Sequence, residues 1–414
     1  MSATPLQNPA PASTLSWRFW VFWASQAVSN LADGFFRVAL PLLAVQLTRD
    51  PLLVSGVAFA LSLPWLLLSL PVGVFVDRWD RRRTMTIANG VRVLVLSLAV
   101  YLLVVGEMNI FVLYAVAFGL GVAETVTDTA AGALLPALVP TAKLEQANAR
   151  LVGVQTVTNQ FLGPPLGSAL VTLGVVYAFG WSGLLYLASF FFLLPIRGLF
   201  TAKRQAFRPL YDALRDGLDF IRASPPLRVV ITIIAALNLC WSAYYALLVL
   251  YAVQPGPLGL SPFQYGLILT SVGVGGTLGA YLVDFVQRHS ERQWLLFGDI
   301  LGLLVLLVVS LLTANFYVFL IAGTIAGIAG SISNVALVSL RQRIVPDEFL
   351  GRVGGASRLF SYGALSLGAA GAGLVAQYVG VRGVFGICIV IVLLVMILCL
   401  KRLPSLAQLY AKTP

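Results

Sequence analysis

The chain has 414 residues, of which 59% are hydrophobic and 10% are charged, and its formal net charge is +11. A mean hydropathy of +0.91 excludes a soluble globular domain, because a water-exposed surface has no place for so much apolar area. The basic residues alternate between loops instead of forming one patch, so we expect no nucleic-acid partner.

Apolar segments of membrane-spanning length recur along the whole chain, since each crossing needs about 20 apolar residues. Together they predict an all-α integral membrane protein with twelve transmembrane helices. In chain order the predicted helices are Trp17–Leu47, Val54–Phe75, Thr84–Val105, Ile110–Leu135, Ala147–Leu173, Val176–Leu194, Leu227–Val253, Phe263–Phe285, Gln293–Leu312, Phe316–Ile344, Gly351–Val379 and Val381–Leu400.

The connections between these helices divide the chain into five parts. We expect a disordered N-terminal tail at 1–16, a six-helix bundle at 17–196, a cytoplasmic linker at 197–226, a second six-helix bundle at 227–400 and a cytoplasmic tail at 401–414. Within the linker, leucine and isoleucine recur at helical spacing, which predicts a short amphipathic helix on the cytoplasmic interface. We expect no cleavable signal peptide.

Charge and an internal repeat support this division. Of the 27 Lys and Arg residues, only Arg49 and Arg382 fall in connections that this topology places outside, so both termini are predicted to be cytoplasmic. A shift of 207 residues places Arg92 on Asp299, and a shift of 208 places Asp33 on Trp241 and Arg37 on Tyr245. The two bundles are therefore predicted to be pseudosymmetric copies.

The densest charge cluster lies between the second and third predicted helices. Its residues Gly73, Asp77, Arg78, Arg81 and Arg82 match the signature G-x-x-x-D-R-x-G-R-R, with Asp80 where glycine is usual. The cluster resembles that of the major facilitator superfamily of transporters, in the exporter branch with macrolide efflux, Tap-type and enterobactin export proteins.

That resemblance implies a fold of two bundles that alternate in access, with the signature as part of a conformational gate. It also implies that an acid on the fourth helix engages the signature. We therefore expect Asp128 to contact Arg78 or Arg81.

Ionisable residues inside predicted helices are candidates for function, because a charge in the bilayer costs about 2.5–3.5 kcal/mol. Asp33 and Arg37 lie one helical turn apart on the same face, so the geometry of the helix allows an ion pair between them. In one interpretation Asp33 carries a proton and Arg37 tunes it; in the other the pair only stabilises its helix. Glu124 lies one turn from Asp128, and we expect it to bind a proton or a cationic substrate.

Further polar and aromatic residues are expected to line the substrate cavity. They are Asn30, Asn159, Asn238, Trp241 and Tyr245. Their amides offer hydrogen bonds, and the aromatic rings suit flat or cationic ligands.

The leading hypothesis is a proton-coupled antiporter that exports amphiphilic or cationic small molecules such as drugs. Alternatives are a lysophospholipid or other lipid translocator, a siderophore exporter, and a membrane receptor or assembly factor without transport. We expect no enzymatic activity, no metal site and no cofactor, because nucleotide-binding loops and His or Cys ligand clusters are missing. The expected source of energy is the proton gradient. We expect a monomer in the lipid bilayer of a bacterial inner membrane.

Overall fold

The structure is a computed structural model that describes residues 15–198, 200, 210–289 and 292–411. The expectations for 1–14 of the N-terminal tail, for 201–209 of the linker and for 412–414 of the C-terminal tail lie outside the described residues.

The N-terminal bundle contains six crossings, and the fifth of them is divided into three segments. Its elements are α1 (Trp17–Leu47), α2 (Pro51–Arg78), α3 (Arg81–Val104), α4 (Ile110–Leu138), the short turn η1 (Thr141–Lys143), α5 (Leu144–Gln155), the π-helical η2 (Thr156–Leu162), α6 (Gly163–Leu173) and α7 (Val175–Leu193).

The C-terminal bundle follows the linker helix α8 (Leu210–Ala223) and also contains six crossings. Its elements are α9 (Pro225–Ala252), α10 (Pro262–His289), η3 (Arg292–Phe297), α11 (Gly298–Leu312), α12 (Phe316–Ile344) and α13 (Asp347–Ala411). Across the described residues, nine helices are long and apolar enough to cross a membrane. The joined segments α5, η2 and α6, the short helix α11, and the second half of α13 bring the helices to the expected twelve.

Local sequence explains the breaks and starts of these helices. The chain turns inside α13 at Gly380, whose φ of 72° is a conformation that residues with a side chain rarely adopt. Pro164 and Pro165 lack the backbone N–H that an α-helix needs, and the π-helical segment η2 precedes them directly. Asp50 begins α2 because its carboxylate accepts the N–H of Leu52 at 2.8 Å.

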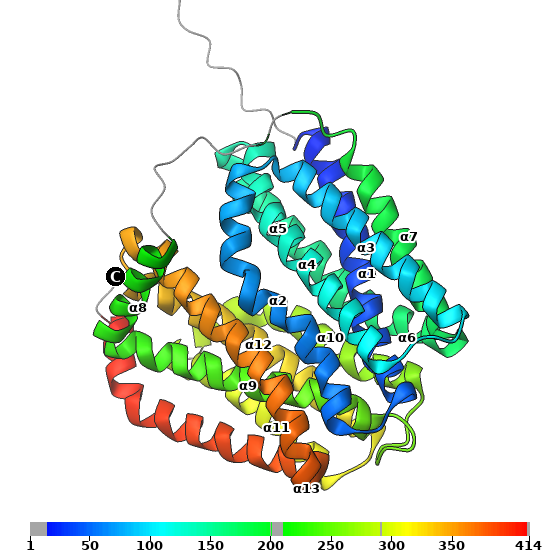
Figure 1. Ribbon diagram of the computed structural model, residues 1–414. Helices are drawn as coiled ribbons and strands as arrows, with labels where there is room; N and C mark the ends of the chain where they lie inside the picture. The colour runs from blue at the N-terminus through cyan, green and yellow to red at the C-terminus, as the bar shows by residue number, and fades with distance from the viewer. Residues whose placement is uncertain (1–14, 199, 201–209, 290–291, 412–414) are drawn as a thin grey trace, which may run out of the picture.

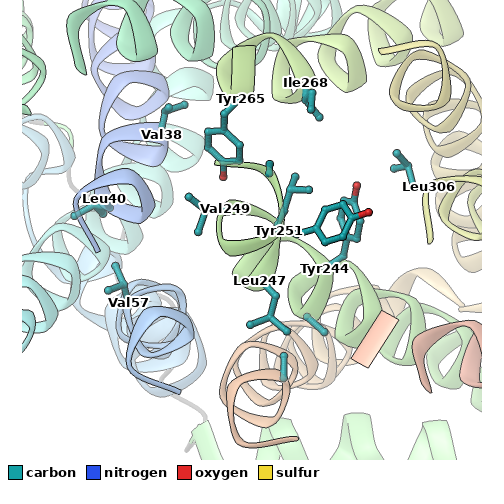
Figure 2. Close-up of a cluster of buried hydrophobic side chains, with 14 of the residues drawn as sticks. Val38, Leu40, Val57, Tyr244, Leu247, Val249, Tyr251, Tyr265, Ile268 and Leu306 are labelled. Carbon is teal, nitrogen blue, oxygen red and sulfur yellow. The ribbon is translucent and has the colours of Figure 1, made fainter. Parts of the chain in front are cut away.

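The two bundles share one core at one end of the molecule and have separate cores at the other. Figure 1 shows the bundles as two groups of helices, and Figure 2 shows apolar side chains of both meeting: Val38 of α1, Val57 of α2, Val249 of α9 and Tyr265 of α10. At the end that carries the linker, one core contains residues of the N-terminal bundle together with Phe200 at the start of the linker. Another there contains only α8 and C-terminal residues, such as Ile221 and Val353.

Helix α8 forms as expected and packs against the C-terminal bundle. Ile221 is buried, and the rings of Phe220 and Phe349 stack with centroids 4.9 Å apart. Its other face carries Arg215 and Arg222, which pair with Asp219 at the surface. Helix α8 is therefore attached to the C-terminal bundle, at the end of the molecule where the linker lies.

Helix α1 approaches α6 at two glycines. A Cβ added at Gly34 would lie 2.6 Å from the Cα of Gly163 and 2.8 Å from the carbonyl oxygen of Asn159. Both obstacles are backbone atoms, which cannot rotate away.

We therefore expect Gly34→Ala to destabilise the protein by about 1–3 kcal/mol through overpacking. The thermal unfolding midpoint in detergent should fall. The matched control is Gly132→Ala in α4, where an added Cβ meets nothing within 4 Å. Equal midpoints for the two variants would show that α1 and α6 separate at little cost.

Candidate functional site

Five charged residues of α1, α3 and α4 form a central charge cluster inside the N-terminal bundle. They are Asp33, Arg37, Arg92, Glu124 and Asp128, and each lies within electrostatic reach of several others. Because these helices pack side by side, residues far apart in the sequence share one volume. The cluster holds three carboxyl groups and two guanidinium groups.

Asp33 is bound by side chains from two other helices of the bundle, Arg92 of α3 and Tyr186 of α7. Its Oδ1 lies 3.7 Å from Nη1 of Arg92 and accepts the hydroxyl of Tyr186 at 2.5 Å. Arg92 is 1% exposed, donates to Ser29 at 3.0 Å and lies 4.7 Å from the centre of the Tyr186 ring. A buried carboxylate with a cation and a hydroxyl donor is well compensated.

The ion pair that helix geometry allows between Asp33 and Arg37 is not formed. Arg37 instead crosses to α4, where its Nη2 lies 2.8 Å from Oε1 of Glu124. Helical spacing permits a contact four residues along α1, but packing places a second acid beside Arg37 and a second arginine beside Asp33. Arg37 keeps 49% of its side chain exposed, although its neighbours in sequence are buried, so the arginine end of this pair lies at an open surface of the bundle.

Asp128 is the acid of the cluster that lacks an ion pair with any residue that the structure describes. It is partly buried and lies within electrostatic reach of both Glu124 and Arg92. Its expected contact with Arg81 is not made, because Nη1 of Arg81 donates to the carbonyl of Ala133 at 2.8 Å. The position of Asp128 therefore joins it to the cluster.

The signature arginines bind the ends of helices in their own bundle. Arg82 donates to the carbonyls of Leu193 and Leu194 at 2.9 and 2.8 Å, at the end of α7, as Arg81 does near the end of α4. The carbonyls at the end of α7 lack helical partners and carry partial negative charge, which suits the guanidinium donor of Arg82. These contacts stabilise the N-terminal bundle and do not join it to the other bundle.

Asp80, which replaces the usual glycine of the signature, has two roles. One carboxylate oxygen begins α3 by accepting the N–H of Arg83 at 2.8 Å, and the other accepts the N–H of Phe200 at 2.8 Å. The start of the linker is thereby held against the N-terminal bundle.

Three signature residues keep their gate role only as a prediction. The side chain of Asp77 lies outside the described part, and Arg78 is exposed. An added Cβ at Gly73 would meet nothing within 4 Å, so no contact in this structure explains the glycine.

The polar cavity candidates lie at separate places. Asn30 is buried and donates to the carbonyl of Gln26 at 2.8 Å within α1. Asn159 is buried in η2, with its backbone against Gly34 next to Asp33. Asn238 is partly buried in α9.

Trp241 and Tyr245 lie away from the central charge cluster, in the C-terminal bundle. Their rings stack at 5.4 Å with planes 18° apart. The indole N–H of Trp241 donates to Asp299 at 3.0 Å. Asp299 therefore makes its contact within the C-terminal bundle and does not pair with Arg92 of the N-terminal bundle.

Contacts between the bundles include one aromatic pair and several polar groups. Trp65 of α2 stacks on Tyr362 of α13 at 4.9 Å, and Tyr362 lies within electrostatic reach of Arg358, Asp128 and Glu124. The central charge cluster therefore faces α13 of the other bundle.

Polar contacts join the bundles at the end opposite the linker. Arg49 donates to the carbonyl of Gln254, and the amide of Gln377 lies 3.4 Å from the carboxylate of Asp50. Together with the shared apolar core, these contacts hold the bundles together at that end.

Sequence reasoning missed Tyr186, Ser29 and Trp65. Tyr186 offered a weak signal, since its hydroxyl needs a partner inside an apolar helix. Ser29 and Trp65 gave none, because small polar and aromatic residues are common in membrane helices.

Comparison with known proteins supports the class of protein that this fold and charge pattern define. The family of transmembrane secretion effectors, within the major facilitator superfamily, matches residues 10–412. The chain belongs to this family, and it is therefore a multi-pass membrane transporter of small molecules and not an enzyme.

Relatives of similar length agree with that assignment. The chain is 21% identical over 386 residues to macrolide efflux protein A of Streptococcus pyogenes, covering 91% of this chain and 95% of the relative. It is 27% identical over 400 residues to the enterobactin exporter EntS of Citrobacter koseri, covering 94% and 93%. The expected resemblance to exporters is thereby confirmed.

A solved structure matches the fold. A bacterial homologue of the iron transporter ferroportin, in an inward-facing state, superposes with a TM-score of 0.75 and 18% identity, covering 94% of this chain and 99% of that one. This likeness concerns the fold alone.

Proposed function

We propose that this protein exports an amphiphilic or cationic small molecule across a bacterial inner membrane in exchange for protons. The observation that carries the proposal is the excess of acid in the central charge cluster. With all five residues ionised, three carboxylates face two guanidinium groups and one negative charge is left over. A proton or a cationic ligand neutralises that charge, and the two compete for it.

The pairing pattern assigns different roles to the acids. Asp33 is enclosed by Arg92 and Tyr186, so it stabilises the bundle. Glu124 is held by Arg37, whose side chain is half exposed. Asp128 has no ion pair among the described residues, and we assign it the exchange between proton and substrate.

The arrangement of the hydrophobic cores allows the two bundles to move relative to each other, as the exchange of proton and substrate requires. The bundles share apolar and polar contacts opposite the linker and have separate cores at the linker end, which the distribution of basic residues predicts to be cytoplasmic. Alternating access requires the first set of contacts to open as the other end closes. Binding of a proton or substrate at the cluster, between the two ends, biases that equilibrium.

Reconstituted protein tests this function. Proteoliposomes with a pH-sensitive dye inside receive ethidium, erythromycin or lysophosphatidylcholine as probes. We expect the cationic probes ethidium and erythromycin to move protons in the opposite direction, and a collapsed pH gradient to stop their accumulation. Transport of lysophosphatidylcholine without proton movement, and none of the cationic probes, would contradict the proposal and favour the lipid translocator.

A further inference from the structure

Two equivalent positions contact each other in each bundle, but the residues at these positions carry different charges in the two bundles. The repeat places Asp33 on Trp241 and Arg92 on Asp299. In the N-terminal bundle the two positions make the ion pair between Asp33 and Arg92, at 3.7 Å. In the C-terminal bundle they make the hydrogen bond from Trp241 to Asp299, at 3.0 Å.

This difference leaves Asp299 of the C-terminal bundle with no counter-charge among the side chains that the structure describes. The N-terminal pair joins an acid to a base and sums to zero, whereas the indole of Trp241 is neutral. Within the described chain Asp299 makes no ion pair, although it lies in the first turn of a membrane helix. An intramembrane acid without a counter-charge is costly to keep ionised, and such acids commonly carry ions or protons.

Among the described side chains, few groups that titrate lie near Asp299. From α9, Tyr245 lies within electrostatic reach, stacked on Trp241. From α12, Gly330 is so close that an added Cβ would lie 3.2 Å from Oδ1 of Asp299. The side chains of Arg292 and Gln293 in η3 lie outside the described part. Asp299 itself is partly buried.

We infer that Asp299 is a second proton-binding carboxyl, so that each half of the transporter carries one. This inference rests on the proposed function. A proton from the outer solution binds a carboxylate oxygen of Asp299, and the same proton is released at the linker end after the bundles have moved.

Geometry favours a proton over a metal cation at this position. Hard cations collect about six oxygen ligands, and an N–H donor aimed at the carboxylate opposes a positive ion. Here the donor is the indole of Trp241, and the close neighbour Gly330 offers no side-chain oxygen. A proton needs only one free lone pair of the carboxylate.

Asp299→Asn separates this role from a purely structural one, because the amide oxygen still accepts from Trp241 but binds no proton. In proteoliposomes we expect the number of protons moved per ethidium to fall by about half, with one of two carriers removed. Asp299→Glu should restore the ratio. Glu107→Gln removes an exposed acid in the turn after α3 and should leave the ratio unchanged.

Infrared difference spectroscopy on the full-length protein in liposomes gives a readout that needs no substrate. Asp128 also contributes to the protonated-carboxyl signal, so we expect the pH-dependent band of the wild type to contain a component that shifts with Asp299→Glu and is absent in Asp299→Asn, while the rest of the band persists. An unchanged band in Asp299→Asn, an unchanged proton ratio, or a site that responds to sodium and not to pH would overturn the inference. If the wild type moves no protons with any probe, the proposed function fails, while the infrared titration still decides whether Asp299 binds one.

Discussion

Asp128→Asn is expected to stop proton-driven efflux while leaving the protein folded. Asparagine has nearly the same shape but binds no proton, and Asp128 has no ion pair in the described chain whose loss would leave a buried charge. Accumulation of ethidium under an imposed pH gradient should fall about tenfold or more, the effect of ~1.4 kcal/mol of lost coupling. Exchange of labelled for unlabelled ethidium without a gradient should persist.

The matched comparison is Glu124→Gln, one turn away on the same helix. This change frees Arg37, which is already half exposed, so its effect should fall mainly on substrate affinity. If Glu124→Gln abolished proton-driven efflux while Asp128→Asn retained it, the carrier would be Glu124 and our assignment would be wrong.

Arg92→Met is expected to destabilise the protein strongly. It leaves Asp33 buried with the Tyr186 hydroxyl and no cation, and breaking one partner of a buried pair costs about 3–5 kcal/mol. The thermal unfolding midpoint in detergent measures the loss. Tyr186→Phe removes a hydrogen bond but no charge, so we expect a smaller fall, of about 1 kcal/mol.

The double variant Asp33→Leu with Arg92→Met supplies the control. Both charges are removed together, so no uncompensated ion remains, and the midpoint should recover much of the loss. A double variant less stable than Arg92→Met alone would show that Asp33 contributes stability without its partner.

Membrane-spanning segments were predictable because their signal is local. A run of apolar residues such as Phe316–Ile344 is long enough to cross a bilayer whatever lies beside it, and the structure forms α12 over this range. The break at Gly380 was also local, since a residue without a side chain adopts its positive φ easily. The exporter resemblance likewise rested on a short stretch and is confirmed by the family.

Partners of the charged residues were not predictable in the same way. Sequence spacing offered Arg37 to Asp33, four residues along one helix, but the structure gives Asp33 to Arg92 and Arg37 to Glu124. It offered Arg81 to Asp128, but Arg81 donates to a carbonyl near the end of α4. These choices depend on which helices are neighbours and how each is rotated.

By itself, the amino-acid sequence determined the membrane class, the twelve helices, the repeat of two halves and the family, because hydropathy, charge placement and a short motif are written residue by residue. Only the tertiary structure decided which acids form ion pairs and which do not. A charge inside a low-dielectric core interacts with whatever lies within a few ångströms, and that distance is set by helix packing and not by separation along the chain.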